Sequence, residues 1–261
     1  MKTKMFLGLL WATFIAYTLL LAPLDRPGTL TVMEKMLTFQ LEGINPYLVT
    51  VFALMGVWPM VYACLLFIDE KTQNISAWPA FIASNGAGII GLIPYLLLRQ
   101  PQPQFSGRKD MLIKISDSRW TGIVLLLTTI WLLAWAWLNG DWGDYVRQWQ
   151  SIPFVHLITW DCCFMAVIFP SLLGDDMARR GLADDRIFWA VSLVPLLGPL
   201  TYLCLRPPLP ESATEICTFP LTARNSNIEK FGSVQDVMNI QAATGLTNAQ
   251  KATLRGLAAI A

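Results

Sequence analysis

Six long runs of apolar residues constrain what this chain can fold into. A helix rises about 1.5 Å per residue, so some 20 apolar residues cross a hydrocarbon layer of about 30 Å. The fifth run contains one aspartate and one histidine, and the others carry no charged side chain. The sequence therefore predicts an all-α, polytopic membrane protein with six transmembrane helices. They are expected at about 5–23, 46–68, 77–98, 120–138, 152–174 and 187–205.

The chain divides into a helix bundle, residues 1–206, and a polar tail, residues 207–261. Prolines at 207 and 208 end the last apolar run because proline cannot continue a helix. Ser233–Asp236 and Thr247–Gln250 approximate helix-capping signatures, which indicate a short helical hairpin over about 233–260. The alternative is a tail that orders only against a partner. At the other end, the first run is longer than the h-region of a signal peptide, which is about 7–15 residues, so a retained helix is expected.

Composition excludes several classes of function. With 19 basic and 18 acidic residues the net charge is +1, which gives no indication of nucleic-acid binding. The five cysteines show no C-x-x-C spacing, so neither a zinc site nor a disulfide framework is predicted. His156 is the only histidine, which excludes haem ligation by two histidines of the same chain.

The basic residues give conflicting indications of how the six expected spans are oriented in the membrane. The odd-numbered connections hold most of the basic residues, namely Arg26, Lys35, Arg99, Arg108, Lys109, Lys114, Arg119, Arg179, Arg180 and Arg186. The positive-inside rule places these connections in the cytoplasm or the stroma. Lys2 and Lys4 favour the opposite orientation for the first helix.

Asp161 lies near the middle of the fifth run, where an aspartate costs about 2.5–3.5 kcal/mol on insertion scales. One hypothesis is a carboxylate of a proton relay or an ion pathway. A second is a protonated or hydrogen-bonded acid that fixes helix packing against Asn85, Tyr62 or Thr128. A third is an assembly contact with another subunit.

His156 allows two interpretations. It can be an axial ligand to the magnesium of a chlorophyll, with chlorophyll or carotenoid at an interface as the expected cofactors. It can also be an interfacial histidine close to the membrane edge, without a cofactor.

The third run contains small residues at four-residue spacing, Ala83, Ala87 and Gly91 as well as Ser84 and Gly88. Such ladders let helices approach closely in lipid. Prolines in four of the runs predict kinked helices. Kinks and close packing suit a transporter as well as a static bundle, and no inverted repeat relates the first three runs to the last three.

The segment "GDDMARRGLADDR" concentrates charge between the fifth and sixth runs. Its candidate residues are Asp175, Asp176, Arg179, Arg180, Asp184, Asp185 and Arg186. A diphosphate-binding enzyme would use a second acidic motif opposite this one, and none is recognisable. Asp175–Arg179 and Asp176–Arg180 are spaced as (i, i+4) pairs with the acid first. The sequence thus predicts an internally paired helical turn, which can serve as a docking surface for a partner.

Four stretches resemble a family of integral membrane proteins from cyanobacteria and plastids. They are "WPAFIASNGAGIIGLIPYLLLR", "SRWTGIVLL", "FPSLLGDDMARRG" and "FWAVSLVPLLGPLTYLCLRPPLP", and the resemblance covers roughly residues 51–210. The resemblance implies a thylakoid or cyanobacterial inner membrane and an accessory role beside a larger complex. It implies no catalytic residue.

Three functions follow as hypotheses. The leading one is a non-enzymatic accessory, assembly or scaffold component of a photosynthetic membrane complex. The second is a carrier of a small solute or an ion that uses Asp161. The third is an intramembrane enzyme of lipid or isoprenoid metabolism, which requires a second polar cluster facing Asp175 and Asp176.

Overall fold

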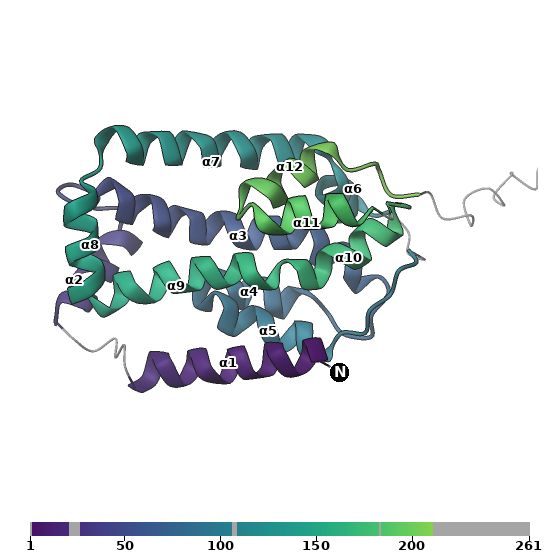
Figure 1. Ribbon diagram of the computed structural model, residues 1–261, viewed down its shortest axis with the longest axis horizontal. Helices are drawn as coiled ribbons and strands as arrows, with labels where there is room; N and C mark the ends of the chain where they lie inside the picture. The colour runs from purple at the N-terminus through teal and green to yellow at the C-terminus, as the bar shows by residue number, and fades with distance from the viewer. Residues whose placement is uncertain (1, 21–26, 106–108, 183, 211–261) are drawn as a thin grey trace, which may run out of the picture. The chain divides into compact units, whose positions relative to one another are not determined.

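The computed structural model describes residues 2–20, 27–105, 109–182 and 184–210, which belong to one compact unit, Met1–Ser212 (Figure 1). All regular elements among these residues are α-helices. The hairpin expected over 233–260 lies outside the described residues. The helices are α1 Lys2–Leu20, α2 Pro27–Leu37, α3 Pro46–Glu70, α4 Trp78–Ala87, α5 Ile89–Leu98, α6 Met111–Asp117, α7 Arg119–Asn139, α8 Trp142–Ser151, α9 Pro153–Ile168, α10 Pro170–Arg179, α11 Asp185–Leu193 and α12 Leu197–Leu205.

Four segments are long and apolar enough to cross a membrane, as expected of an integral membrane protein. They are Thr3–Leu20, Pro46–Glu70, Arg119–Asn139 and Pro153–Arg179. The last combines α9 and α10, which meet at Phe169 and Pro170 without leaving helical backbone angles. The most apolar stretch of α3 is 67% buried and that of α1 only 11%. The core is therefore built around α3, and α1 lies at the periphery.

The expected span over 77–98 is instead a hairpin of two short helices, α4 and α5. The chain reverses at Gly88, whose φ of 55° is open to glycine at little cost. A Cβ at Gly91 would lie 2.4 Å from the carbonyl carbon of Ala83, although one straight helix would separate these residues by about 12 Å. The Gln73 side chain donates to the Gln100 carbonyl and accepts from its N–H at 2.6 and 2.8 Å. Both ends of the hairpin thus lie together, and each arm is about 15 Å long.

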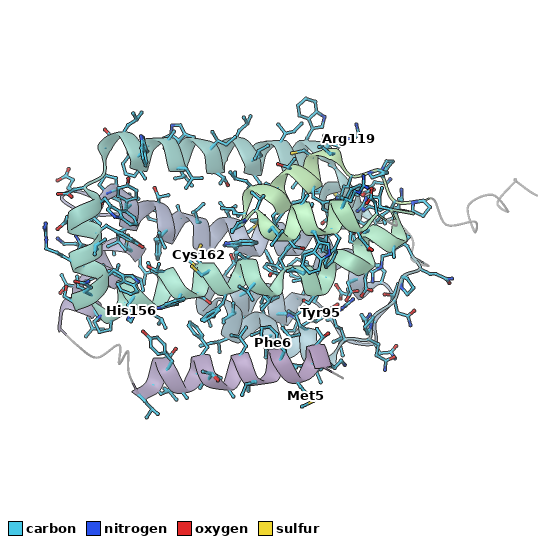
Figure 2. The ribbon with its side chains drawn as sticks, in the orientation of Figure 1. Met5, Phe6, Tyr95, Arg119, His156 and Cys162 are labelled. Atoms are coloured by element: carbon cyan, nitrogen blue, oxygen red, sulfur yellow. The ribbon has the colours of Figure 1, made fainter. Side chains whose placement is uncertain are left out.

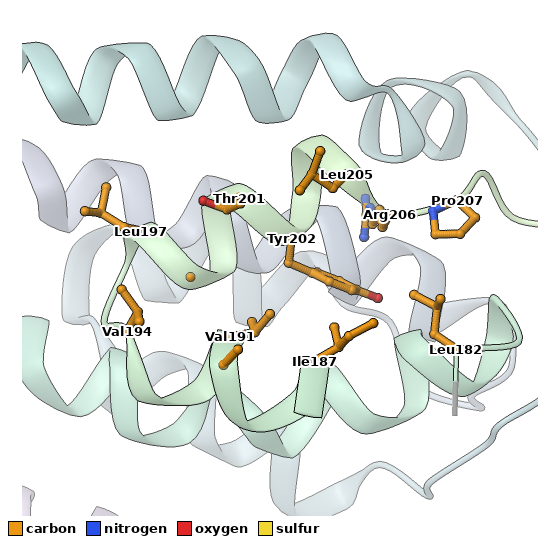
Figure 3. A pocket seen from close by; sticks show the side chains of 12 residues that line it. Leu182, Ile187, Val191, Val194, Leu197, Thr201, Tyr202, Leu205, Arg206 and Pro207 are labelled. Atoms are coloured by element: carbon orange, nitrogen blue, oxygen red, sulfur yellow. The ribbon is translucent and has the colours of Figure 1, made fainter. Parts of the chain in front are cut away.

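The expected span over 187–205 is a second hairpin, made of α11 and α12 (Figure 3). It turns at Leu196, which has a φ of 59°, in the sequence Val194-Pro-Leu-Leu-Gly-Pro199. A Cβ at Gly198 would lie 2.3 Å from the carbonyl oxygen of Val191. Proline in the turn prevents a continuous helix, so the prolines that predicted a kink mark a full reversal.

The order of elements occurs twice along the chain. A long helix (α1, α7), a short helix (α2, α8), a second long helix (α3, α9–α10) and a hairpin (α4–α5, α11–α12) follow one another in each half. Hairpin helices pack alike, α5 against α1 and α12 against α7. Gly8 of α1 approaches Leu97 of α5, and Gly122 of α7 approaches Leu203 and Cys204 of α12. The halves are direct repeats, in which corresponding helices follow one another in the same order without inversion.

The two repeats run in the same direction. In Figure 1 the first residues of α1 lie at the right, and Figure 2 labels Arg119, the first residue of α7, at the same end. The long helices α3 and α10 finish there, as do both hairpins. We call this the charged end, after the ion pairs of Asp69, Arg99, Arg180 and Arg206 that gather there. Helices α2 and α8 lie at the opposite end (Figure 1).

If the segments 77–98 and 187–205 are hairpins, the connections on either side of each segment lie on the same side of the membrane. Residues 71 and 114 lie on the same side when residues 77–98 form a hairpin, and on opposite sides when they cross. In a cysteine-free background, Lys71→Cys and Lys114→Cys are both exposed positions. We expect a membrane-impermeant maleimide to label both from the same face of oriented vesicles. Labelling from opposite faces contradicts the hairpin.

Candidate functional site

Asp161 lies about halfway along the bundle, next to Cys162, which Figure 2 labels on α9. Its side chain is buried, and Oδ1 accepts a hydrogen bond of 2.9 Å from the N–H of Ile89. Ile89 is the first residue of α5, and the first four N–H groups of a helix have no acceptor within that helix. Asp161 therefore caps the half-length helix of the first hairpin from a helix of the other half.

The tip of the hairpin is shaped around this carboxylate. A Cβ placed on Gly88 would lie 1.6 Å from Oδ2 of Asp161. No side chain other than hydrogen fits between the turn and the carboxylate. Glycine is thus required at position 88 both by its positive φ and by the closeness of Asp161.

The partners expected for Asp161 have other contacts. Asn85 is exposed and donates to the carbonyl of Phe81 in its own helix at 2.7 Å. Tyr62 donates to the carbonyl of Met165 at 2.6 Å. The hydrogen-bond partner of Asp161 is instead a backbone group, the Ile89 N–H, which becomes free because the chain breaks at Gly88.

A buried charge network occupies the charged end, and its first part is the first triad, Asp69, Tyr95 and Arg99. The Asp69 carboxylate, at the end of α3, is fully buried. Arg99 donates to both of its oxygens, from Nε and Nη2, at 2.8 Å each. Tyr95 donates to Oδ2 at 3.0 Å. The triad fastens the returning arm of the first hairpin to α3.

The second triad, Asp176, Tyr202 and Arg206, repeats this arrangement in the other half. Tyr202 donates to Oδ2 of Asp176 at 2.7 Å, and Arg206 Nη1 donates to the same oxygen at 3.1 Å. In both triads the tyrosine follows the aspartate by 26 residues and the arginine follows it by 30. The pattern Asp-x25-Tyr-x3-Arg was available in the sequence, and it is the signal that would have revealed the repeat.

Ion pairs also join the halves to each other. Arg179 of α10 donates to Oδ1 of Asp69 at 2.5 Å, and Arg99 pairs with Asp175. Arg180 also pairs, at 2.6 Å, with Asp117 of α6, the helix that connects the two halves. The network consists of Asp69, Asp117, Asp175 and Asp176 with Arg99, Arg179, Arg180 and Arg206. Lys109 lies at its edge, 3.9 Å from Asp117.

Two arginines of the network, Arg99 and Arg180, stay charged in spite of burial. Burial by itself lowers the pKa of Arg99, but hydrogen bonds and charge from Asp69 and Asp175 raise it above its usual value. The pKa of Arg180 is raised in the same way, since Asp176 and Asp117 outweigh the effect of burial. A buried charge that keeps its partners is stable, whereas removing one partner costs about 3–5 kcal/mol.

The loop "GDDMARRGLADDR" differs from the predicted self-contained turn. Asp176 and Arg180 do pair at 2.9 Å with the expected spacing. Asp175 and Arg179 instead pair with Arg99 and Asp69 of the first half. Three of the seven residues of the expected docking surface, Asp176, Arg179 and Arg180, are buried inside the network. Asp184, Asp185 and Arg186 remain exposed, and Asp184 caps α11 by accepting from the N–H of Arg186.

His156 is engaged within the protein, near the end opposite the network (Figure 2). The Tyr17 hydroxyl lies 2.6 Å from Nδ1 and 3.2 Å from Nε2, and the Trp149 ring centroid is 4.5 Å from that of the imidazole. A chlorophyll magnesium would have to displace Tyr17, so the ring does not fit an axial ligand as it stands. Among the described residues, no three histidine, cysteine or acidic side chains are grouped as a metal site.

A cavity of about 470 Å³ lies between α11 and α12 (Figure 3). Its walls are mainly aliphatic, and Tyr202 and Arg206 of the second triad line one end. No family model, curated protein or solved structure matches this chain.

Proposed function

We propose that this protein is a membrane carrier for a small solute or an ion, with Asp161 at its centre. The observation that carries the proposal is the bond from the Ile89 N–H, at the tip of a half-length hairpin, to a buried carboxylate of the other half. Secondary transporters commonly place their sites at the bilayer midplane, at the interface of repeats, where helices are interrupted. Direct repeats of the kind found here also occur among transporters.

The chemistry available at Asp161 suits a charge-dependent step. The carboxylate lies at the N-terminus of α5, where the helix dipole favours a negative charge. Protonation of the carboxylate, or a cation bound to it, would weaken its hold on the Ile89 N–H. The tip of the hairpin would thus respond to what binds at Asp161.

The proposed topology has four crossings and two hairpins, both of which enter from the charged end. Basic residues of the described helices and loops then collect on one side, which resolves the conflict between Lys4 and the loops. They are Lys4, Lys71, Arg99, Lys109, Lys114, Arg119, Arg179, Arg180, Arg186 and Arg206, with Lys35 and Arg147 at the other end. By the positive-inside rule the charged end faces the cytoplasm or the stroma.

Proton flux in liposomes tests the role of Asp161. The purified protein is reconstituted with a trapped pH-sensitive dye, and uptake is started by a potassium diffusion potential. We expect uptake above that of protein-free liposomes, and a loss of at least about tenfold in Asp161→Asn, which corresponds to about 1.4 kcal/mol. Cys163→Ser, an exposed position two residues away on α9, is the matched control and should transport normally. Equal rates for Asp161→Asn and the control contradict the proposal.

The accessory role remains a second proposal, together with the thylakoid or cyanobacterial membrane that the resemblance implies. One observation favours a protein partner. Trp131 is 64% exposed near the middle of α7, although tryptophan is usually enriched at the membrane interfaces. Native electrophoresis in mild detergent with mass spectrometry would detect a partner complex, and migration solely as a free monomer would contradict it.

An enzyme of lipid or isoprenoid metabolism is the least favoured of the three hypotheses. It requires a polar cluster facing Asp175 and Asp176. The groups that face these acids are Arg99, Arg206 and Tyr202, and they pair with them directly.

A further inference from the structure

The residues of the two triads repeat along the chain, whereas the residues that form ion pairs between the halves do not. Asp69 and Asp176, Tyr95 and Tyr202, and Arg99 and Arg206 each lie 107 positions apart. At the same offset, Arg179 corresponds to Thr72 and Asp175 to Ile68. Asp175 and Arg179, which form ion pairs with the first half, thus have no charged counterpart in the repeat. Fastening a hairpin within its half needs the triad alone, and the added pair serves only to join the halves.

A cavity adjoins the bonds between the halves. It has a volume of about 330 Å³ and is lined by α1 and α5 of the first half and by α10 and α11 of the second. Arg99 and Asp175, which pair across the halves, both line it, as do Leu96 and Ser171. Separation of this pair would widen the cavity toward the interior of the bundle.

The segment that carries Asp175 and Arg179 is placed to move as one piece. Pro170 begins α10, and a proline removes a backbone hydrogen bond and marks a site of bending. Asp161 lies before this proline, on α9, and Asp175 and Arg179 lie after it, on α10. Bending at Pro170 would shift the ion pairs without displacing Asp161.

At the opposite end the halves are joined by other kinds of contact. Asn45 donates to the Asp141 carbonyl at 2.7 Å and to Asp144 at 2.9 Å, and the Tyr17 hydroxyl bonds to His156. The ion pairs between the halves are therefore a feature of the charged end within the described part of the chain.

We propose that the pairs Asp69–Arg179 and Arg99–Asp175 form a gate that holds the charged end of the carrier closed. This inference rests on the proposed function and adds the step by which access to Asp161 is controlled from the side we assign to the cytoplasm or the stroma. Substrate would enter through the cavity between α1, α5, α10 and α11 when both pairs separate.

Cysteine accessibility tests the gate without measuring transport. Leu96→Cys, in a cysteine-free background, places a buried thiol on the first-half wall of the cavity. With membrane-impermeant maleimide at the charged end, we expect slow labelling in the otherwise unchanged protein. Asp175→Asn should raise the rate at least about fivefold, the lower end of the range for coupled sites. Asp175→Glu keeps the charge and should stay closed.

Asp176→Asn is the matched control, since Asp176 is the neighbouring acid and pairs within its own half and not across the gate. Arg179→Gln provides a second test, because it breaks the other pair. Unchanged labelling in both folded gate variants overturns the gate, whatever the flux measurement shows. Faster labelling in them, but not in Asp176→Asn, supports it, even if proton flux fails to support Asp161 as the transport site.

Discussion

Replacement of Asp69 with asparagine is expected to lower the free energy of unfolding by about 3–5 kcal/mol. Asp69 is fully buried and binds Arg99, Arg179 and Tyr95. The variant leaves two buried guanidinium groups facing a neutral amide, where Arg99 keeps its pair with Asp175 and Arg179 keeps its bond to the Gln102 carbonyl. Thermal unfolding in detergent micelles, followed by intrinsic tryptophan fluorescence, measures the loss.

The exposed pair of Lys71 and Asp110 is the control. Its atoms are as close, at 2.6 Å, but the side chains are 35% and 45% exposed. Asp110→Asn should therefore cost no more than about 1 kcal/mol, as for other surface pairs. Because Asp176 is also fully buried and binds Arg180, Arg206 and Tyr202, Asp176→Asn should be as costly as Asp69→Asn. Equal unfolding midpoints for Asp69→Asn and Asp110→Asn would show that burial gives the network no special weight.

Replacement of Gly88 with alanine is expected to disrupt the first hairpin. Two costs add at this position: a backbone conformation, φ 55° and ψ −130°, that costs a residue with a Cβ about 1–3 kcal/mol, and a Cβ that would overlap Oδ2 of Asp161 at 1.6 Å. The carboxylate must move away, so the bond to the Ile89 N–H is lost as well. The expected loss of stability exceeds about 3 kcal/mol when the missing cap is included.

Gly86→Ala is the matched control, two residues earlier in α4, because a Cβ there meets nothing within 4 Å. Alanine favours a helix by about 0.5–1 kcal/mol over glycine, so Gly86→Ala should be neutral or slightly stabilising. Combining Gly88→Ala with Asp161→Ala removes the overlap and should recover part of the loss. If the two substitutions are simply additive, the contact between Gly88 and Asp161 does not shape the hairpin.

The distribution of apolar residues predicted where the helices lie. Two of the six segments expected as single spanning helices, 77–98 and 187–205, are hairpins instead. A run of 22 apolar residues has the same hydropathy whether it forms one helix or two. What distinguishes them is local: Gly88 adopts a positive φ beside Asp161, and Gly91 packs against Ala83. The prolines at 195 and 199 indicated an irregularity, and only the packing of Gly198 on Val191 made it a reversal.

The functional residues show the same division. Asp161 could be singled out because an acid in an apolar run needs a partner, and Asp176–Arg180 because an (i, i+4) spacing is local. The partners Asp69, Arg99 and Arg206 are 26 to 110 positions from the groups they bind. Such contacts depend on how each hairpin folds back on its long helix and, for Arg179, on how the halves meet, which residue spacing within one helix does not report.

The sequence by itself determined that this chain buries itself in a membrane, since more than half of its residues are hydrophobic and they are gathered in runs long enough to cross it. Tertiary structure decided which of those runs form long helices and which fold into hairpins. The physical reason is that hydropathy measures transfer into lipid, whereas the direction of a chain is decided by single backbone angles. Two such turns, at Gly88 and Leu196, bring Arg99 and Arg206 back to the ends of α3 and α10. There each arginine pairs with the aspartate that precedes it by 30 residues, Asp69 or Asp176.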